Sequence, residues 1–350
     1  MPPPTFARNE ILFGWFSYWF LEKRLGLWDS VISKFQFTVH CNIYLFWKRS
    51  ILVLKTDNIL IPYLFDIIMR EQIHIESTIT KKSLKPFIRW AGGKQNLINE
   101  IYKNIDFSNV DRFFEPFLGG GSFFLHGNFK QSFLSDLNPN LINCYQQIKN
   151  NPQAVYQGLT SYSIPVTPEK YYIVRNEFNF HNGEQTLEQA IRFIFLNKTS
   201  FNGIYRVNKS GLYNVPFGKP EPAFPSLKHL INVSNKLNTA VIFTAYYDEI
   251  GEIARENDLI YLDPPYPKLS DTAYFNHYTL DKFDITEHIK FAQFANEMRN
   301  KGCKIVISNA DLPEIRELFS SWNILECSTY RYISCKKERV KIKELIIKNI

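Results

Sequence analysis

This sequence of 350 residues contains no closely spaced cysteines and no long apolar runs. Its five cysteines are widely spread and form no C-x-x-C pair, which argues against a disulfide framework and against a zinc site. We therefore expect no bound metal and a reducing, cytoplasmic setting. The aromatic-rich runs at residues 11–20 and 35–47 are each shorter than the roughly 18 to 20 apolar residues of a membrane span, so we expect no membrane partner.

Methionine is also scarce, which bears on where the protein begins. Only Met1, Met69 and Met298 occur, and Met69 lies shortly before the first recognisable motif, behind a segment without a clear pattern. Glu10 precedes the first apolar run and no small-residue cleavage pattern follows it, which fits a signal peptide poorly. We expect Met69 to be the authentic start and residues 1–68 to be an extension of unknown role.

The composition is that of a folded protein with a basic surplus. Hydrophobic residues make up 45% of the chain and charged ones 21%, which suits a sizeable core in one large domain or two. The formal charge of +7 favours an anionic partner such as nucleic acid. The same surplus spread over an evenly solvated surface would have no specific meaning.

From residue 86 onward, short apolar runs alternate with helix-like segments, which predicts an α/β sheet. We expect strands at residues 112–115, 131–135, 241–244, 259–262, 304–308, 322–328 and 341–347. Residues 151–239 are polar and aromatic and lack this alternation, so we interpret them as an inserted second domain.

A carboxylate, two prolines and an aromatic ring follow the apolar run at residues 259–262. Asp263, Pro264, Pro265 and Tyr266 would stand at the end of a buried strand, where α/β enzymes place their chemistry. Because each proline fixes φ and lacks an N–H, the Asp263 carboxylate and the neighbouring carbonyls would be held in one arrangement. These acceptors suit the two N–H donors of an exocyclic amine on a nucleobase, which could stack on Tyr266. The alternative is a strand followed by a polar turn.

Glycines and two acids mark a second pair of strand ends. Three glycines at residues 119–121 follow the strand that ends at Glu115, and they let a ligand approach the backbone unless they form only a flexible turn. Asp136 ends the next strand at the spacing at which an acid in a nucleoside-binding α/β fold reaches the ribose hydroxyls. No further glycine completes the dinucleotide pattern after Ser122. This favours S-adenosylmethionine over NAD.

A loop upstream adds an aromatic ring and an amine. Arg89, Trp90, two glycines and Lys94 could close over a nucleoside and a carboxylate, although a solvated turn fits the pattern equally. Five segments then follow in order: residues 90–94 (WAGGK), 115–121 (EPFLGGG), 135–139 (SDLNP), 202–206 (NGIYR) with 214–218 (NVPFG), and 263–266 (DPPY). In this order they resemble the Dam-like DNA adenine-N6 methyltransferases (D12 class, alpha group). The resemblance covers about residues 85–350.

This resemblance implies an α/β fold with a Rossmann-like, S-adenosylmethionine-dependent methyltransferase sheet. The catalytic domain would comprise residues 69–150 and 240–350, and residues 151–239 would be an inserted, mostly helical target-recognition domain that carries a β-hairpin. The implied catalytic residues are Asp263, Pro264, Pro265 and Tyr266. The implied cofactor-binding residues are Trp90, Lys94, Glu115, Asp136 and Asp263, with Lys94 near the methionine carboxylate and Asp136 on the ribose.

By the same resemblance, a hairpin contacts double-stranded DNA. Its candidate residues are Phe201, Asn202, Ile204, Arg206 and Asn208. An apolar side chain would wedge beside the target, and Arg206 would recognise a guanine, whose O6 and N7 match its guanidinium. Arg89 stands where the family often has a guanine-contacting lysine, so a donor is kept with a different geometry. Lys336, Lys337 and Arg339 depart from the family's Ser/Asn/Gly-rich loop and are either DNA contacts or a solvated charge run.

The expected reaction is methyl transfer from S-adenosylmethionine to N6 of a flipped adenine, within 5′-GATC-3′, by a monomer that needs no metal. The enzyme would belong to a restriction-modification system, with a separate cognate endonuclease, or act as an orphan methylase. Cytosine-N4 methyltransferases more often have Ser, and protein-glutamine methyltransferases Asn, where Asp263 stands. A DNA-binding module that has lost catalysis, or an interaction protein using the aromatic N-terminus, would not need the intact set of acids, lysine and tyrosine.

Overall fold

The structure is a computed structural model that describes residues 46–48, 51–53, 83–162, 165–218, 223–267, 283–330 and 341–350. The chain divides into two units, Met1–Lys81 and Lys82–Ile350. In the first unit, β1 (Phe46–Lys48) pairs antiparallel with β2 (Ile51–Val53). The rest of the extension expected at residues 1–68 lies outside the described residues, and so do Lys336, Lys337 and Arg339.

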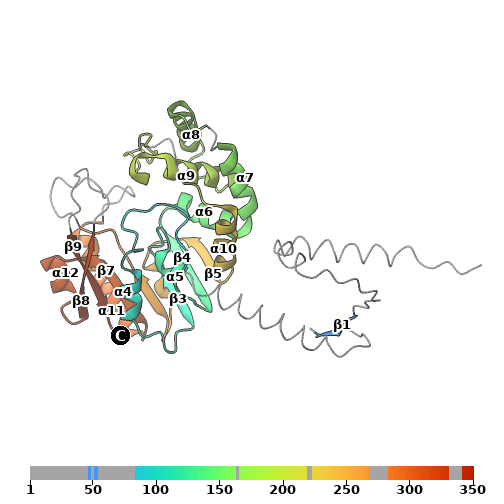
Figure 1. Ribbon diagram of the computed structural model, residues 1–350. Helices are drawn as coiled ribbons and strands as arrows, with labels where there is room; N and C mark the ends of the chain where they lie inside the picture. The colour runs from blue at the N-terminus through green and yellow to red at the C-terminus, as the bar shows by residue number, and fades with distance from the viewer. Residues whose placement is uncertain are drawn as a thin grey trace, which may run out of the picture. The chain divides into compact units, whose positions relative to one another are not determined.

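The second unit is built on a seven-stranded, mostly parallel sheet in the order β5-β4-β3-β6-β7-β9-β8 (Figure 1). The first five strands run parallel to one another, and β9 is antiparallel to both β7 and β8. Their bounds are β3 (Arg112–Glu115), β4 (Gln131–Asp136), β5 (Ala240–Thr244), β6 (Leu259–Leu262), β7 (Lys304–Ala310), β8 (Asn323–Tyr330) and β9 (Lys341–Lys348). The predicted mixed α/β architecture is therefore confirmed.

The predicted strands lie where the sequence placed them, with small shifts at their ends. β3 and β6 have the predicted bounds. β4 extends to Asp136 because its ladder with β5 continues to the pair Asp136↔Thr244. β8 begins at Asn323 and not at Trp322, whose ring packs against Phe319 in the core. Where a strand ends depends on how far it pairs with the neighbouring strand. The residue pattern of a single strand does not give this information.

Side chains of the central strands alternate between two apolar layers, as the twofold repeat of a strand requires. Phe113 and Tyr261 join the larger cluster, on the side of the helices that precede β5 in the chain. Phe114 and Leu262 join the smaller one, which contains side chains of α11 (Ile285–Asn300). The further helices are α4 (Ile98–Lys103), α5 (Ser122–His126), α6 (Pro139–Asn150) and α12 (Pro313–Leu318). Because both faces are covered, β6 is apolar throughout and fully buried.

The segment interpreted as an insertion is mostly helical. It contains α7 (Pro152–Tyr162), α8 (Pro168–Phe180), α9 (Leu187–Thr199), the short 3-10 helix η1 (Phe201–Gly203) and α10 (Leu227–Leu237). Thr186 begins α9 by accepting a hydrogen bond from the Gln189 N–H. Most side chains of α9 are buried, and α9 packs on α6, α7 and α8. The apolar side chains of these helices are continuous with the larger cluster beside the sheet.

The strand order reverses between β3 and β6. From β3 the chain proceeds outward through β4 to β5, and it then returns to the other side of β3 as β6 and proceeds to β7. In open α/β sheets, ligands bind beyond the carboxyl ends of the strands at such a reversal. Glu115 ends β3 and Asp263 follows β6, so the predicted acids stand at this position.

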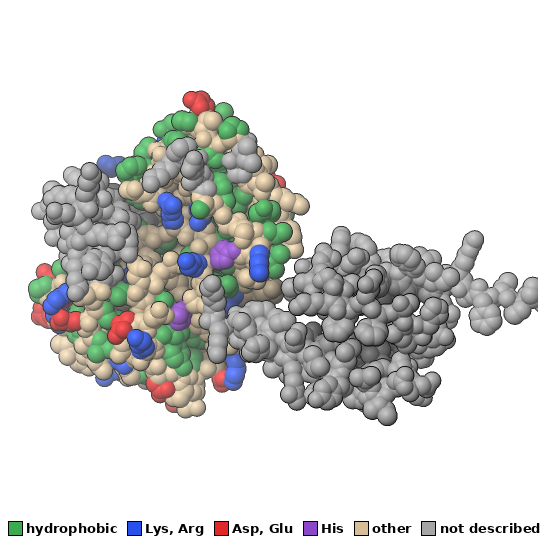
Figure 2. Space-filling view, in the orientation of Figure 1, with side chains coloured by type: hydrophobic (Ala, Val, Ile, Leu, Met, Phe, Trp, Pro, Cys, Tyr) green, Lys and Arg blue, Asp and Glu red, His purple; other side chains and the backbone are tan. Residues whose placement is uncertain are grey.

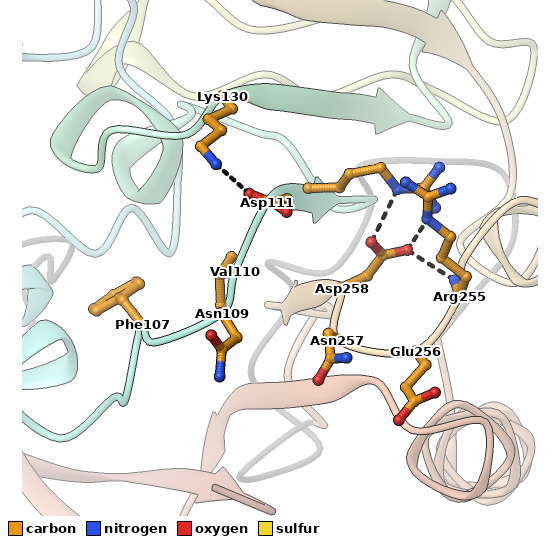
Figure 3. Close-up of a pocket in the computed structure, with 10 residues that line it drawn as sticks. Phe107, Asn109, Val110, Asp111, Lys130, Arg255, Glu256, Asn257 and Asp258 are labelled. Atoms are coloured by element: carbon orange, nitrogen blue, oxygen red, sulfur yellow. Dashed lines mark hydrogen bonds and ion pairs between the residues drawn. The ribbon is translucent and has the colours of Figure 1, made fainter.

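The opposite, amino-terminal edge of the same strands holds a cavity of about 660 Å³ (Figure 3). Its lining includes a buried ion pair, in which Arg112 Nε lies 2.9 Å from Asp258 Oδ1. Asp258 also accepts the Arg255 N–H at 2.7 Å. A second pair, between Lys130 and Asp111, is exposed (Figure 3). The pair of Arg112 and Asp258 joins the starts of β3 and β6, at the end of the sheet opposite the candidate site.

Replacing Asp258 with alanine should destabilise the fold strongly. The guanidinium of Arg112, whose side chain is 13% exposed, would lose its carboxylate partner. We expect the free energy of unfolding to fall by roughly 3 to 5 kcal/mol, measured by denaturant unfolding. Asp111→Ala, which removes the exposed pair, is the matched control and should change stability far less. Equal losses in the two variants would contradict this interpretation.

Candidate active site

The carboxylate that follows β6 forms an ion pair with a buried lysine. Lys94 Nζ lies 2.8 Å from Asp263 Oδ1 and 4.7 Å from the centre of the Tyr266 ring. The same ammonium donates to the Gly92 carbonyl at 2.5 Å, and the lysine is only 4% exposed. A predicted cofactor residue and two predicted catalytic residues therefore meet in one cluster. The sequence predicted each of them but not their mutual contact.

A second acid, Glu344 of β9, completes this cluster. Tyr266 donates its hydroxyl to Glu344 Oε2 at 2.9 Å, and the same oxygen lies 3.9 Å from Lys94 Nζ. Our sequence analysis did not single out Glu344. Its signal is a charged residue two positions from both Ile342 and Ile346, on the strand face where an apolar side chain is expected.

Burial and the charges of the cluster together raise the pKa of Asp263 toward neutral pH. Burial raises the pKa of Asp263 to about 6; Lys94 opposes the rise, and the charge of Glu344 adds to it. Burial and the nearby Asp263 and Glu344 charges raise the pKa of Tyr266 well above its ordinary value. Tyr266 therefore stays neutral and keeps its hydroxyl as a donor. At neutral pH, Asp263 is an ionised acceptor that can bind an amine.

Asp136, at the end of β4, is tied to the glycine turn after β3. Its Oδ2 accepts the Gly119 N–H and its Oδ1 accepts the Asn138 N–H, each at 3.0 Å. Burial raises its pKa to about 6, against the lowering effect of these N–H groups. The Leu137 N–H also bonds this carboxylate. Because a carboxylate has about four acceptor positions, part of its acceptor capacity stays available for a ligand's hydroxyl.

Glu115 lies deeper, under the same turn. It is 2% exposed, and its Oε2 accepts the Phe124 N–H at 3.0 Å at the start of α5. Burial raises the pKa of Glu115 well above its ordinary value. This contact gives the acid a role in holding the start of α5, beside any role toward a ligand.

Trp90 connects the glycine turn with the segment after α9. A Cβ added at Gly119 would come within 2.6 Å of Trp90 Cδ1, so the indole lies directly on a glycine whose φ is +47°. The indole also stacks with Tyr205 and Phe193, whose ring centres lie 5.8 Å and 6.4 Å away. Only glycine fits this turn, because of both its backbone conformation and the ring above it.

The predicted hairpin segment, residues 201–208, lies in an antiparallel loop at residues 200–217 whose two legs pair through isolated bridges. The bridges join Ser200 to Phe217 and Val207 to Tyr213. At the tip, Asn208 accepts the N–H groups of Ser210 and Leu212 through Oδ1. Asn208 therefore stabilises the turn. The sequence did not predict this structural contact. We call residues 200–217 the recognition hairpin, after the role that the sequence predicts for this segment.

Among the remaining predicted residues of the recognition hairpin, Phe201, Asn202 and Arg206 are exposed and Ile204 is half-buried. Phe201 is 49% exposed. Asn202 has a φ of +57°, a left-handed conformation that asparagine tolerates better than most residues. Arg206 is exposed, and its Nε donates to Asn214 Oδ1 at 2.8 Å. Arg89 is exposed as well, and its stem lies against Gly203.

Residues 90–333 match the family of D12 class N6 adenine-specific DNA methyltransferases. The chain belongs to this family. It is 33% identical to the type II methyltransferase M.MjaIII of Methanocaldococcus jannaschii, over 76% of this chain and 99% of that protein. It is also 33% identical to a DNA adenine methylase of Vibrio cholerae, over 76% and 96% of the two chains. The DNA adenine methylase of Escherichia coli K12 is 31% identical, over 76% and 95%.

This protein is therefore an adenine-specific DNA methyltransferase, as the order of its motifs indicated. Among its described residues there is no group of His, Cys, Asp and Glu that could hold a metal ion. None of the helices in the described part is long and apolar enough to cross a membrane. The structure brings Lys94, Asp263 and Tyr266 of this methyltransferase into direct contact, whereas Asp136 and Glu115 lie around the glycine turn.

The charge of Glu344 should shift the pH dependence of methyl transfer to DNA, on top of the larger effect of burial on Asp263. Below about pH 6, Asp263 becomes protonated and loses both its ion pair and one acceptor position, so kcat/KM should fall as the pH decreases. Glu344→Gln keeps an acceptor for the Tyr266 hydroxyl but removes the charge that raises the pKa of Asp263. The acidic limb of the kcat/KM profile should therefore move to lower pH.

Glu326→Gln is the control for this experiment, since Glu326 is an exposed acid of β8 that pairs with Lys343 and Arg316. It should leave the acidic limb in place. An unchanged limb in Glu344→Gln, or a shift to higher pH, would show that Glu344 does not act on Asp263.

Proposed function

We propose that this methyltransferase transfers a methyl group from S-adenosylmethionine to N6 of an adenine that is flipped out of double-stranded DNA. The observation that carries this proposal is the cluster of Lys94, Asp263, Tyr266 and Glu344 beyond the carboxyl end of β6. It provides an ionised acceptor, an aromatic ring and a buried ammonium in a protein whose family methylates adenine. A base inside a duplex is out of reach of such a site, so flipping is required.

The groups around the reversal of strand order fit S-adenosylmethionine, which joins a nucleoside to an amino acid without phosphates. Asp136 keeps acceptor positions for the ribose hydroxyls, and Lys94 is a cation for the carboxylate. Trp90 and the turn at residues 119–121 would line the site, with Glu115 on the cofactor side. Bound S-adenosylmethionine would supply an electrophilic methyl group on a positively charged sulfur.

The chain's own residues then orient the adenine. The Asp263 carboxylate and the Pro264 carbonyl would accept the two N–H groups of the N6 amine, while Tyr266 stacks on the base. Because Pro264 and Pro265 restrict the backbone, these acceptors are fixed before the substrate arrives. After transfer the N6 proton becomes acidic, and Asp263, with a pKa of about 6, can accept it.

DNA contacts would come from residues 151–239, acting as an inserted target-recognition domain, and from Arg89. In the recognition hairpin these contacts would be made by Phe201, Asn202, Ile204, Arg206 and Asn208. Separate Lys and Arg side chains are spread over the face drawn in Figure 2. Burial and the neighbouring Arg89 lower the pKa of Lys198 to about 8, which an approaching phosphate would reverse.

The expected target is 5′-GATC-3′, and the expected enzyme is a cytoplasmic monomer. Two of the relatives are named DNA adenine methylase and one type II methyltransferase. The protein would accordingly act either as an orphan methylase or beside a separate restriction endonuclease. The competing functions are a sequence-specific DNA-binding protein without activity and a cytosine-N4 methyltransferase.

Methylome sequencing of a methylation-deficient bacterial host tests this function directly. The host would express the full chain, residues 69–350 alone, or the Asp263→Ala variant. We expect N6-methyladenine in one short motif from the first two proteins and none from the variant, because the variant lacks an acceptor for the N6 amine. Methylation by Asp263→Ala would refute the assigned role, and N4-methylcytosine would favour the competing enzyme.

Arg206→Ala should relax specificity at one base pair of that motif. A bidentate contact to guanine contributes about 1 to 3 kcal/mol of discrimination, so we expect discrimination at that position to fall by roughly 5-fold to 150-fold in kcat/KM. Lys209→Ala, at the tip of the same hairpin, is the control and should affect all duplexes alike. A uniform loss in Arg206→Ala would make it a phosphate contact only.

A further inference from the structure

Asn197 on α9 is a buried amide that joins two distant parts of the chain. It is 2% exposed. Its Oδ1 accepts the Arg89 N–H at 2.8 Å, and its Nδ2 donates to the Arg89 carbonyl at 2.7 Å. Nδ2 also lies 3.3 Å from the Gly203 carbonyl, in the recognition hairpin. Only this orientation of the amide satisfies both backbone groups of Arg89, since the oxygen accepts and the nitrogen donates.

The side chain of Arg89 is fixed at the same junction. A Cβ at Gly203 would lie 2.4 Å from Arg89 Cδ and 3.0 Å from Arg89 Cβ, so the stem of the arginine rests on the bare glycine backbone. Gly203 has a φ of +65°. The stem of Arg89 thus packs on the recognition hairpin, and its backbone is held by Asn197, which contacts the same hairpin. Arg89 and Asn197 are 108 residues apart in the sequence.

The other leg of the recognition hairpin is held in a similar way. Asn179 of α8 accepts the Tyr213 N–H at 2.8 Å and donates to the Tyr213 carbonyl at 3.0 Å. Each leg of the hairpin is therefore attached to a helix by the side-chain amide of an asparagine, which hydrogen-bonds to backbone groups. The amide of Asn197 differs in that it connects the hairpin to the segment that carries Arg89 and Trp90.

We propose that Asn197 is a specificity-determining positioning residue. It holds the backbone of Arg89 in a fixed register with the recognition hairpin, so that the guanidinium of Arg89 and the hairpin side chains meet the DNA together. This rests on the proposed function, in which both elements contact DNA. Recognition of a base edge by a guanidinium depends on geometry within about half an ångström. A buried residue that never touches DNA can therefore control it.

The test uses the full chain with Asn197→Asp. The carboxylate keeps an acceptor for the Arg89 N–H but cannot donate to the carbonyls of Arg89 and Gly203, which it would repel. The substrates are duplexes with the motif found by methylome sequencing and its single-base-pair variants. Arg89→Ala identifies the base pair that Arg89 recognises. There, Asn197→Asp should lower discrimination in kcat/KM by roughly fivefold or more, with smaller changes at the other base pairs.

Two further variants separate positioning from simple loss of stability. Asn143→Asp makes the same change at a fully buried asparagine of α6, whose Nδ2 donates to the Thr186 carbonyl at 2.8 Å. It should lower the melting temperature and leave discrimination unchanged. Gly203→Ala keeps the Asn197 side chain, but it displaces the Arg89 stem and strains the backbone whose carbonyl Asn197 contacts. It should therefore relax the same base pair as Asn197→Asp.

An equal loss on all duplexes in Asn197→Asp would overturn the proposal, since Asn197 would then be a structural residue only. If Asn197→Asp does not fold, Gly203→Ala decides, and unchanged discrimination there overturns it. If the proposed function itself is wrong, the experiment gives a different result. In that case the unaltered protein methylates no duplex, or Arg89→Ala discriminates as well as the unaltered protein does.

Discussion

The parallel pairing of β3 with β6 is the constraint on which the active site depends. It joins Phe113 to Leu259 and Phe114 to Ile260, far apart in the chain, and so brings the ends of both strands to one edge of the sheet. The acids that follow these strands become neighbours only through this pairing. The amino ends are fixed independently by the buried pair of Arg112 and Asp258. Polar chemistry can then gather at the other end without weakening the sheet.

At that end, one ammonium stands between two carboxylates. Lys94 is in contact with Asp263 and within ion-pair distance of Glu344, and Tyr266 links the two acids by donating to Glu344. Two acids that share one cation repel each other, which helps to keep the pKa of Asp263 near 6. The same arrangement fixes the ring of Tyr266 by its hydroxyl. Electrostatics and positioning are thus supplied by the same four side chains.

The glycine turn and the recognition hairpin are joined by the short segment of Arg89 and Trp90. Trp90 packs on Gly119 on one side and stacks on Tyr205 on the other, while the backbone of Arg89 is paired with Asn197. A displacement of this segment would therefore change contacts both at the proposed cofactor site and at the proposed DNA surface. Such coupling suits an enzyme that must bind two substrates before it reacts.

Much of the fold could be predicted from the sequence because its signals are local. The apolar run at residues 259–262 needs no partner to be recognised as a buried strand, and Pro264 and Pro265 fix their own backbone. The motif order likewise identified the family. Strand ends were less certain, because the end of β4 depends on its pairing with β5.

The sequence by itself determined the α/β class and the family, and it predicted the residues of the candidate site. Only the tertiary structure decided which of them touch. It placed Glu344, from the last strand, against Tyr266, and it used Asn197 to tie Arg89 to the recognition hairpin. It also gave Asn208 and Glu115 structural contacts. The physical reason is that hydrogen bonds and ion pairs between distant segments depend on how the chain packs, which no local pattern records.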